Sequence, residues 1–210
     1  MTEEGMTEEE ARSWIVERFG VSRETLVERF VNLLVAESTR QNLVSAASMD
    51  QIWRRHIVDS AQLLALAGAP EDGHWIDIGT GAGFPGMIIA LLSDRPVTLI
   101  EPRRKRADFL TDAAKTLGLA RRVVVHARRA EQVTMTASVI SARAVAQLPE
   151  LLAAAAHLSH RETLWLLPKG PSAREEVAAA AQTWHGSFHV EHSITEAGSL
   201  IITAKGVARR

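Results

Sequence analysis

Hydrophobic positions in the first part of the chain recur every three or four residues, which is the spacing of one face of an α-helix. Thr7 and Glu10 form a capping box, because a threonine followed three positions later by a glutamate satisfies the first free amides of a helix. Two more helices are expected, from about Ser22 and over residues 49–67. Glycine and proline between residues 68 and 73 end the pattern, so residues 1–70 are predicted to form a helical segment.

Beyond this break, runs with strand-like alternation take turns with helical runs, as in a doubly wound α/β sheet. Strands are predicted over residues 74–78, 97–101, 122–126, 138–142, 163–167, 188–193 and 200–204. Helices are predicted over residues 85–92, 103–117, 148–158 and 173–182. No helix separates the last two strands, which predicts an antiparallel hairpin at the end of a mostly parallel, seven-stranded, Rossmann-like sheet. Residues 71–210 are expected to form this α/β domain.

A glycine-rich loop, Gly79-Thr80-Gly81-Ala82-Gly83-Phe84-Pro85-Gly86, joins the first strand to the next helix. Glycines at such a turn permit positive φ and let a ligand approach the main chain. The frame that starts at Gly81 fits a dinucleotide fingerprint, in which the helix N-terminus binds a pyrophosphate. The frame that starts at Asp77 places a carboxylate beside the loop, and Glu101 follows at the end of the second strand.

Electrostatics favours the second frame. A carboxylate near a pyrophosphate opposes its binding, whereas S-adenosylmethionine has no phosphate and carries an ammonium and a sulfonium. Glu101 suits either frame as an acceptor for ribose hydroxyls. We therefore predict S-adenosylmethionine bound by Asp77, Gly79, Gly81, Gly83 and Glu101; a nucleotide or flavin, and a purely structural glycine turn, remain alternatives. The expected C-terminal hairpin is also typical of methyltransferase folds and not of ordinary dinucleotide-binding folds.

The composition narrows the function further. The chain has 210 residues, of which 46% are hydrophobic, and contains no cysteine. Disulfides, thiolate metal sites and cysteine nucleophiles are therefore excluded. Methylation at pyrimidine C5 is excluded as well, because it commonly proceeds through a cysteine adduct. No metal site is predicted. The charge-free run over residues 78–93 is short and interrupted by glycine, and the N-terminus has no signal-peptide pattern, so a cytoplasmic protein without a membrane partner is expected.

Charge is unevenly distributed. The formal net charge is −1, yet residues 101–130 contain nine basic and three acidic residues. A basic block beside a cofactor loop suits a phosphate backbone, although a solvated helix face is the common alternative for a charge run. Arg103 and Arg106, in this block, are the predicted RNA contacts.

The end of the fourth strand reads Ser141-Ala142-Arg143-Ala144, at the sheet edge where an acceptor should meet the methyl donor. Enzymes that methylate base amines usually place an amide or carboxylate and a stacking ring there, and neither is present. An acceptor with an exposed lone pair, such as guanine N7, loses no proton and needs no general base, so proximity carries most of the catalysis. Arg143 is the candidate catalytic residue, because a guanidinium can contact phosphate, guanine O6 or the cofactor. Lys169, at the same rim, is a further candidate RNA contact.

These segments resemble the bacterial 16S rRNA guanine-N7 methyltransferases, the RsmG or glucose-inhibited division protein B family, across about residues 25 to 205. The resemblance is carried by Asn42-Leu43-Val44-Ser45, Arg55-His56-Ile57, Asp59-Ser60, the glycine loop, Lys105-Arg106, Ala130-Glu131, the Arg143 segment and Pro168-Lys169-Gly170. It implies a class I methyltransferase fold, S-adenosylmethionine as cofactor and a guanine in the 530 loop of 16S rRNA as acceptor.

The same resemblance implies roles for individual residues. Gly79 and Phe84 should line the cofactor pocket, Ala130 and Glu131 should flank the adenine, and Arg143 should complete the site. The expected partner is 16S rRNA or a small-subunit particle, and the enzyme is expected to act as a monomer. The competing functions are a small-molecule methyltransferase, a Rossmann oxidoreductase and a non-catalytic RNA-binding protein. They predict turnover without RNA, binding of NAD or flavin, and RNA affinity without cofactor, respectively.

Overall fold

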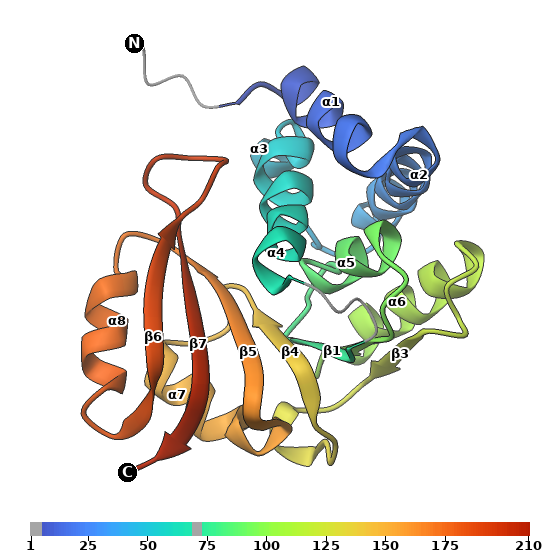
Figure 1. Cartoon of the computed structure of the whole chain (residues 1–210). Coiled ribbons are helices and arrows are strands. Elements are labelled where there is room, and N and C mark those ends of the chain that lie inside the picture. The colour runs from blue at the N-terminus through green and yellow to red at the C-terminus, as the bar shows by residue number, and fades with distance from the viewer. Residues whose placement is uncertain (1–5, 69–72) are drawn as a thin grey trace.

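The computed structural model describes residues 6–68 and 73–210 and shows a seven-stranded sheet with helices on both faces (Figure 1). The strand order is β3-β2-β1-β4-β5-β7-β6. The strands are β1 (Trp75–Ile78), β2 (Val97–Ile100), β3 (Val123–His126), β4 (Ala137–Ala142), β5 (Ser159–Lys169), β6 (Trp184–His192) and β7 (Leu200–Arg209). The strands from β1 to β5 pair in parallel, with Asp77 opposite Leu99 of β2 and Ser141 of β4.

The antiparallel hairpin predicted at the end of the sheet is confirmed. Strand β7 pairs antiparallel with both β5 and β6, and so lies between them. The last strands are longer than their sequence patterns predict, because β5, β6 and β7 continue through exposed polar positions at their ends. A cross-strand partner can order such positions even where they bury nothing. The sequence pattern marks the buried parts of β5 and β7, whereas in β6 it marks the half-buried Phe188 and Val190 and misses the buried Trp184.

Alternate residues of the strands face two separate hydrophobic cores. Trp75 contributes to the core beneath α4, α5 and α6, whereas Ile76 contributes to the core beneath α7 and α8. Every residue of β1 is buried, as expected for a central strand covered on both faces. The helices involved are α4 (Asp59–Ala67), α5 (Gly86–Leu92), α6 (Arg104–Thr116), α7 (Leu148–Ala155) and α8 (Ala173–Ala180).

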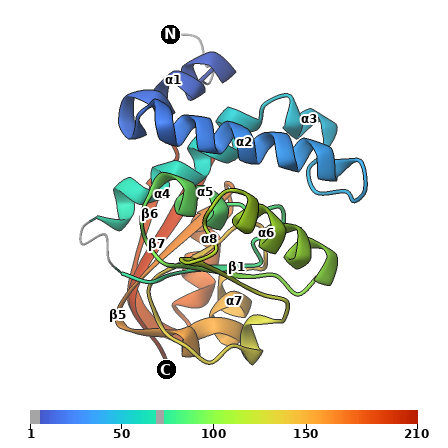
Figure 2. The same ribbon diagram turned by 90° about the vertical axis from the view of Figure 1, so that its right-hand side faces the viewer.

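The N-terminal helices α1 (Glu8–Phe19) and α2 (Val21–Ser38) lie across the first of these cores, above α5 and α6 (Figure 2). The predicted capping box is present: Thr7 Oγ1 accepts from the Glu10 amide at 3.2 Å, and the Glu10 carboxylate accepts from the Thr7 amide at 2.8 Å. Ala11 and Ile15 of α1 are buried, which ties α1 to the helices below it. The expected boundary between residues 1–70 and 71–210 falls on residues 69–72, outside the described residues, so this division stays a prediction.

The helix expected over residues 49–67 is not regular. A short α3 (Ala46–Met49) is followed by a π-helical segment, Trp53–Val58, and only then by α4. The carboxylate of Glu8 caps this segment, since its two oxygens accept from the amides of Trp53 and Arg54, each at 2.9 Å. π-Helical turns are rare and occur frequently at functional sites. This one carries His56 to the edge of the sheet where β4 ends.

Candidate active site

The glycine loop lies between β1 and α5 and is fixed through its main chain. The Gly79 amide donates to the Ile100 carbonyl at 2.8 Å, and Gly79 and Gly81 have φ angles of +64° and +59°. A Cβ added to Gly79 would lie 2.6 Å from Cγ2 of Val145. Residue 79 must therefore be glycine for two reasons, its backbone conformation and the close approach of Val145.

Asp77 is fully buried and supports the loop from below. Its Oδ2 accepts from the Gly86 amide at 2.9 Å, at the start of α5, and its Oδ1 accepts from the Ser141 hydroxyl at 2.7 Å. Burial raises the pKa of Asp77 to about 6, while the bonds from Ser141 and Gly86 oppose this shift. The Asp77 carboxylate, which the sequence predicts to bind the cofactor, faces the protein interior and supports the loop through these two bonds. Its part in cofactor binding stays a prediction.

Glu101 also braces the loop. Its Oε2 accepts from the Gly81 amide at 2.9 Å and its Oε1 accepts from the Arg103 amide at 2.8 Å, with the residue 4% exposed. Each carboxylate oxygen has a second lone pair, so these bonds leave acceptor capacity for a ligand. The contact between Glu101 and a ribose stays a prediction, and the two bonds already fix the orientation of the Glu101 carboxylate.

Three cavities meet at this edge of the sheet. The glycine-loop cavity, about 300 Å³, is lined by Gly79, Gly81, Phe84, Arg106 and Arg143 among others. The β2 cavity, about 550 Å³, is lined by Gly79, Arg103, Ala130, Glu131 and Val145 among others. The rim cavity, about 620 Å³, is lined by Arg54, Arg143, Val145, Lys169 and Glu196 among others. Gly79 thus lies between the first two, and Arg143 between the first and the third.

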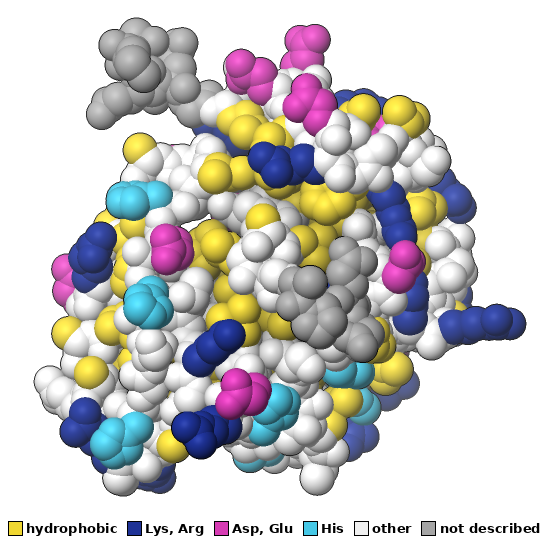
Figure 3. All heavy atoms as spheres, viewed as in Figure 1, with side chains coloured by type: hydrophobic (Ala, Val, Ile, Leu, Met, Phe, Trp, Pro, Cys, Tyr) yellow, Lys and Arg dark blue, Asp and Glu magenta, His cyan; other side chains and the backbone are white. Residues whose placement is uncertain are grey.

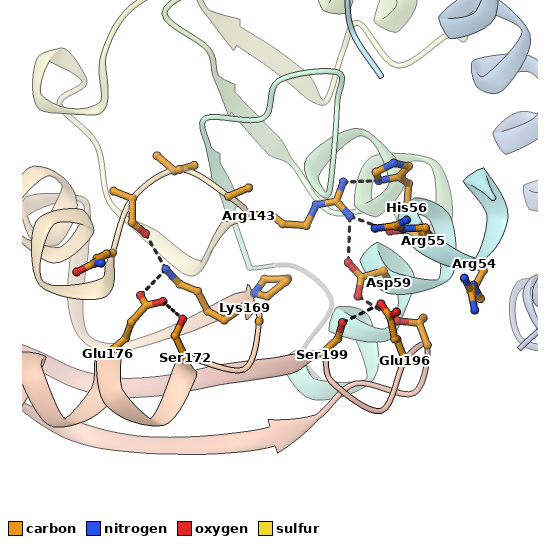
Figure 4. A pocket seen from close by; sticks show the side chains of 17 residues that line it. Arg54, Arg55, His56, Asp59, Arg143, Lys169, Ser172, Glu176, Glu196 and Ser199 are labelled. Atoms are coloured by element: carbon orange, nitrogen blue, oxygen red, sulfur yellow. Dashed lines mark hydrogen bonds and ion pairs between the residues drawn. The ribbon is translucent and has the colours of Figure 1, made fainter. Parts of the chain in front are cut away.

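Arg143 is held by groups from the π-helical segment and α4 (Figure 4). Its Nη1 donates to the Arg55 carbonyl at 3.1 Å and to Oδ2 of Asp59 at 3.0 Å, while Nη2 lies 2.7 Å from Nδ1 of His56. The guanidinium carbon is 5.4 Å from the centre of the Phe84 ring. The predicted catalytic residue is therefore oriented at the junction of two cavities before any ligand binds.

His56 was not predicted as a site residue, and the structure brings it to Arg143. Its ring stacks on Phe84 with centroids 4.8 Å apart, and burial together with the charge of Arg143 lowers its pKa to about 3. A guanidinium only donates hydrogen bonds, so Nδ1 must accept and the proton must be on Nε2. The Nε2 atom has no hydrogen-bond partner among the described residues. In the sequence, the three-residue spacing places His56 and Asp59 on one helix face, which fits an ion-pair network or a brace for the glycine loop and does not single out His56.

Residues expected to flank an adenine do lie together. Ala130 and Glu131 form a short 3₁₀ turn after β3, and both line the β2 cavity with Arg103. The basic side chains differ from expectation in part. Arg106 donates through Nη2 to the Asn42 carbonyl at 3.0 Å and lines the glycine-loop cavity, so it lies at the predicted cofactor pocket, and its contact with RNA stays a prediction.

Lys169 is at the predicted rim, but it is engaged within the protein. Its Nζ donates to Oε2 of Glu176 and to the Ala146 carbonyl, both at 2.7 Å, and its side chain is 9% exposed. The Lys169 ammonium is thus engaged in an internal ion pair, and its contact with an RNA phosphate stays a prediction. Arg103, Arg104 and Lys105 remain exposed at the start of α6.

Charge is segregated on the molecular surface. Acidic side chains gather over α1, whose first turn carries three glutamates, and Lys and Arg side chains follow the edge beside α2 and α6 (Figure 3). No group of three or more His, Asp or Glu side chains suited to a metal lies within residues 6–68 and 73–210. In that part of the chain no helix is long and apolar enough to cross a membrane.

The family model described as rRNA small subunit methyltransferase G matches residues 23–200 of this chain. The chain belongs to the rRNA small subunit methyltransferase G family. A ribosomal RNA small subunit methyltransferase G from Rhizorhabdus wittichii is 48% identical over 209 residues, which cover 98% of this chain and 95% of that protein. The protein of the same name from Zymomonas mobilis is 44% identical and covers 95% of this chain and 94% of its own length. The resemblance drawn from the motifs is thereby confirmed.

Solved structures confirm the class I methyltransferase fold expected of an rRNA small subunit methyltransferase G. A SAM-dependent methyltransferase from Aquifex aeolicus superposes with a TM-score of 0.60 at 14% identity, covering 80% of this chain and 97% of that one. An O-methyltransferase from Bacillus cereus, in complex with SAH, gives a TM-score of 0.59 at 14% identity and covers 92% and 96%. At such low identities the likeness concerns the fold alone.

Proposed function

We propose that this protein transfers a methyl group from S-adenosylmethionine to N7 of a guanine in the 530 loop of 16S rRNA. Family membership supports the coarser statement, an S-adenosylmethionine-dependent methyltransferase of small-subunit rRNA. The observation that carries the finer proposal is the junction at Arg143, where the glycine-loop cavity and the rim cavity share one oriented guanidinium, and where the nearest basic atoms, Oδ2 of Asp59 and Nδ1 of His56, are both bonded to it.

The lining residues fit the proposed cofactor. The β2 cavity, with Ala130 and Glu131, would hold the adenosine, and Glu101 beneath the loop would accept from the ribose. The glycine-loop cavity would hold the amino-acid end, whose carboxylate is complementary to Arg106 and to the Nε2 proton of His56. When bound, the cofactor supplies an electrophilic methyl group on a sulfonium.

Attack by N7 requires only that its lone pair face this methyl group. With the cofactor bound, the N7 lone pair would form the new bond to the methyl carbon, the sulfur–carbon pair would remain on sulfur, and the guanine would become cationic without losing a proton. The groups at the junction match this requirement, since the Nδ1 lone pair of His56 and the carboxylate of Asp59 are both taken up by Arg143. Arg143 contributes a fixed donor that orients guanine O6 or a flanking phosphate, and catalysis rests on proximity.

The proposed acceptor is 16S rRNA, naked or within a small-subunit particle, modified by a monomeric enzyme in the cytoplasm. The surface around the site supports a polyanionic partner: Arg54 and Arg55 line the rim cavity, and the exposed cations at the start of α6 lie beside the β2 cavity.

Transfer of tritium from labelled S-adenosylmethionine tests the proposal. The substrate is 16S rRNA, free or in small subunits, from a bacterial strain lacking this methyltransferase, and the product is digested to nucleosides. Label in 7-methylguanosine from the 530 loop is the expected result. Labelled rRNA without 7-methylguanosine would leave the methyltransferase class standing and remove the N7 assignment. Efficient transfer to small molecules with none to rRNA would replace the proposed substrate altogether.

A further inference from the structure

The short loop that follows β4, residues 143–147, is the wall common to all three cavities. Arg143 and Ala144 line the glycine-loop and rim cavities, and Val145 and Ala146 line the β2 and rim cavities. We call this segment the partition loop. With a cofactor in the glycine-loop cavity and an acceptor in the rim cavity, the methyl group would be transferred beside this loop. The position of the loop therefore sets the distance and angle between the two reactants.

The partition loop has little secondary structure to hold it. Ala144 has a φ angle of +54°, a conformation that residues other than glycine adopt at a cost, and Val145 is 44% exposed while its Cγ2 presses on Gly79. A segment of this kind keeps one conformation only if its surroundings impose it. At its beginning, Arg143 supplies such an anchor through Asp59.

The anchor at the other end is the ion pair between Lys169 of β5 and Glu176 of α8. The Lys169 ammonium donates to the Ala146 carbonyl at 2.7 Å, and Oε2 of Glu176 accepts both that ammonium, at 2.7 Å, and the Leu148 amide, at 2.8 Å. The two side chains are 9% and 11% exposed. The pair therefore binds the main chain on both sides of Gln147, at the Ala146 carbonyl and the Leu148 amide, where the loop ends and α7 begins (Figure 4).

Stability alone is a weak reason for such a pair. Two nearly buried charges lose much of their hydration, and an apolar pair of similar volume is often as stable or more stable. What apolar side chains cannot supply is the two directed hydrogen bonds to the loop. We infer that Lys169 and Glu176 are positioning residues, which fix the partition loop so that acceptor and methyl donor meet in line. This inference rests on the proposed function.

A double variant separates positioning from stability. Lys169→Met with Glu176→Met removes both charges together and keeps the apolar volume, so the protein is expected to fold with a melting temperature close to that of the wild type. The measurements are calorimetric affinity for S-adenosylmethionine and the single-turnover rate of methyl transfer to 16S rRNA at saturating cofactor and RNA. We expect a rate lower by about 100-fold, because small misplacements of reactants cost this much, with a far smaller change in cofactor affinity.

The control is the ion pair of Arg23 and Asp94, which joins α2 to the turn after α5 with 2.8 Å between Nη2 and Oδ1 and has side-chain exposures of 25% and 81%. Neither residue lines any of the three cavities. Arg23→Met with Asp94→Asn should leave the transfer rate unchanged. Should the double variant of Lys169 and Glu176 not fold, Glu176→Gln keeps the size of the side chain and weakens its bonds to Lys169 and to the Leu148 amide. Because Lys169 then lacks its counter-charge, thermal unfolding of this variant is measured beside the transfer rate.

Two results overturn the inference. One is a folded double variant, or a folded Glu176→Gln variant, that transfers at the wild-type rate. The other is a loss of rate no larger than the loss of cofactor affinity, which would mark the pair as merely structural. A wild-type protein that methylates no rRNA at all would instead reject the proposed function, and the inference with it.

Discussion

The glycine loop and the partition loop lie side by side at the same sheet edge and are held in opposite ways. The glycine loop is fixed by its own main chain, through amides that bond to Ile100 and to the carboxylates of Asp77 and Glu101. The partition loop is fixed by side chains of Asp59, Lys169 and Glu176, which are distant in sequence. The contact of Val145 with Gly79 joins the two.

Substitutions in the two loops should therefore act at different steps. A main-chain-held loop is sensitive to any added atom, and damage to it should appear first as weaker cofactor binding. A side-chain-held loop tolerates added atoms at its exposed tip but depends on a few charges, and damage to it should appear first as slower transfer. Four substitutions test this contrast, in order of decreasing effect.

Arg143→Ala removes the anchor that is also the candidate catalytic group, and should have the largest effect. We expect turnover to fall by about 100-fold or more while the protein remains folded, because the guanidinium orients the acceptor beside the methyl donor. Methyl transfer to 16S rRNA and thermal unfolding are measured together. Arg161→Ala is the control, because Arg161 is an exposed arginine of β5 that lines none of the three cavities. Wild-type turnover in Arg143→Ala would refute the role.

Gly79→Ala adds one methyl group to the main-chain-held loop. The positive φ alone costs about 1–2 kcal/mol, which corresponds to a loss of affinity of about 5- to 30-fold when the free loop relaxes out of this conformation, and the clash with Val145 adds to it. Calorimetric titration with S-adenosylhomocysteine measures the loss. Gly118→Ala is matched in backbone strain, since Gly118 has φ +75°, but its Cβ would meet nothing within 4 Å. Adding Val145→Ala to Gly79→Ala should recover part of the affinity. An unimproved double variant would mean that the two loops are not coupled there.

Asp77→Asn tests the buried carboxylate beneath the glycine loop through the pH dependence of stability. The pKa of Asp77 is raised from 3.8 to about 6, so the folded protein binds this proton more tightly than the unfolded chain does. The free energy of unfolding that protonated Asp77 contributes is therefore lost as pH rises from about 4 to 6. The loss is about 1.4 kcal/mol per pH unit and about 3 kcal/mol in all, and the free energy of unfolding does not change further on this account above pH 6. Asp77→Asn should lack this slope.

Urea unfolding of both proteins between pH 4 and pH 7 measures the difference. Asp94→Asn is the control that should leave the curve parallel to that of the wild type between pH 4 and pH 7. The guanidinium of Arg23 lowers the pKa of Asp94 below its ordinary value of 3.8, so the contribution of Asp94 to stability is lost only at lower pH. Parallel stability curves for wild type and Asp77→Asn would show that Asp77 does not titrate in this range.

Reversing Arg103 and Arg106 to Glu should have the smallest effect on chemistry. RNA binding should weaken, and its dependence on salt should flatten by about one unit of slope for each phosphate that is no longer neutralised. Filter binding to 16S rRNA fragments at several salt concentrations measures this, with Lys205→Glu on β7 as the control. Tested singly, Arg106→Glu should also lower cofactor affinity, because Arg106 lines the glycine-loop cavity. An unchanged salt slope in the double reversal would remove both residues from the RNA surface.

Local signals in the sequence predicted the local structure. The capping box at Thr7, the strand–glycine loop–helix unit and the final hairpin depend on neighbouring residues, and all three are present. The π-helical segment was not predicted, because its pattern of buried residues is close to that of an α-helix. The ion-pair partners of Arg143 and Lys169 could not be predicted from local patterns, because charged groups as far apart as residues 59 and 143 meet only through the tertiary fold.

The carboxylate of Glu8 matters for the design of shortened proteins. It ties the first turn of α1 to the amides that open the π-helical segment, and that segment presents His56 and the Arg55 carbonyl to Arg143. No residue of α1 lines any of the three cavities. A shortened protein that begins after α1 would keep every side chain that lines the three cavities. It would lose the Glu8 carboxylate that fixes the start of the π-helical segment, so we advise against removing α1 for crystallisation.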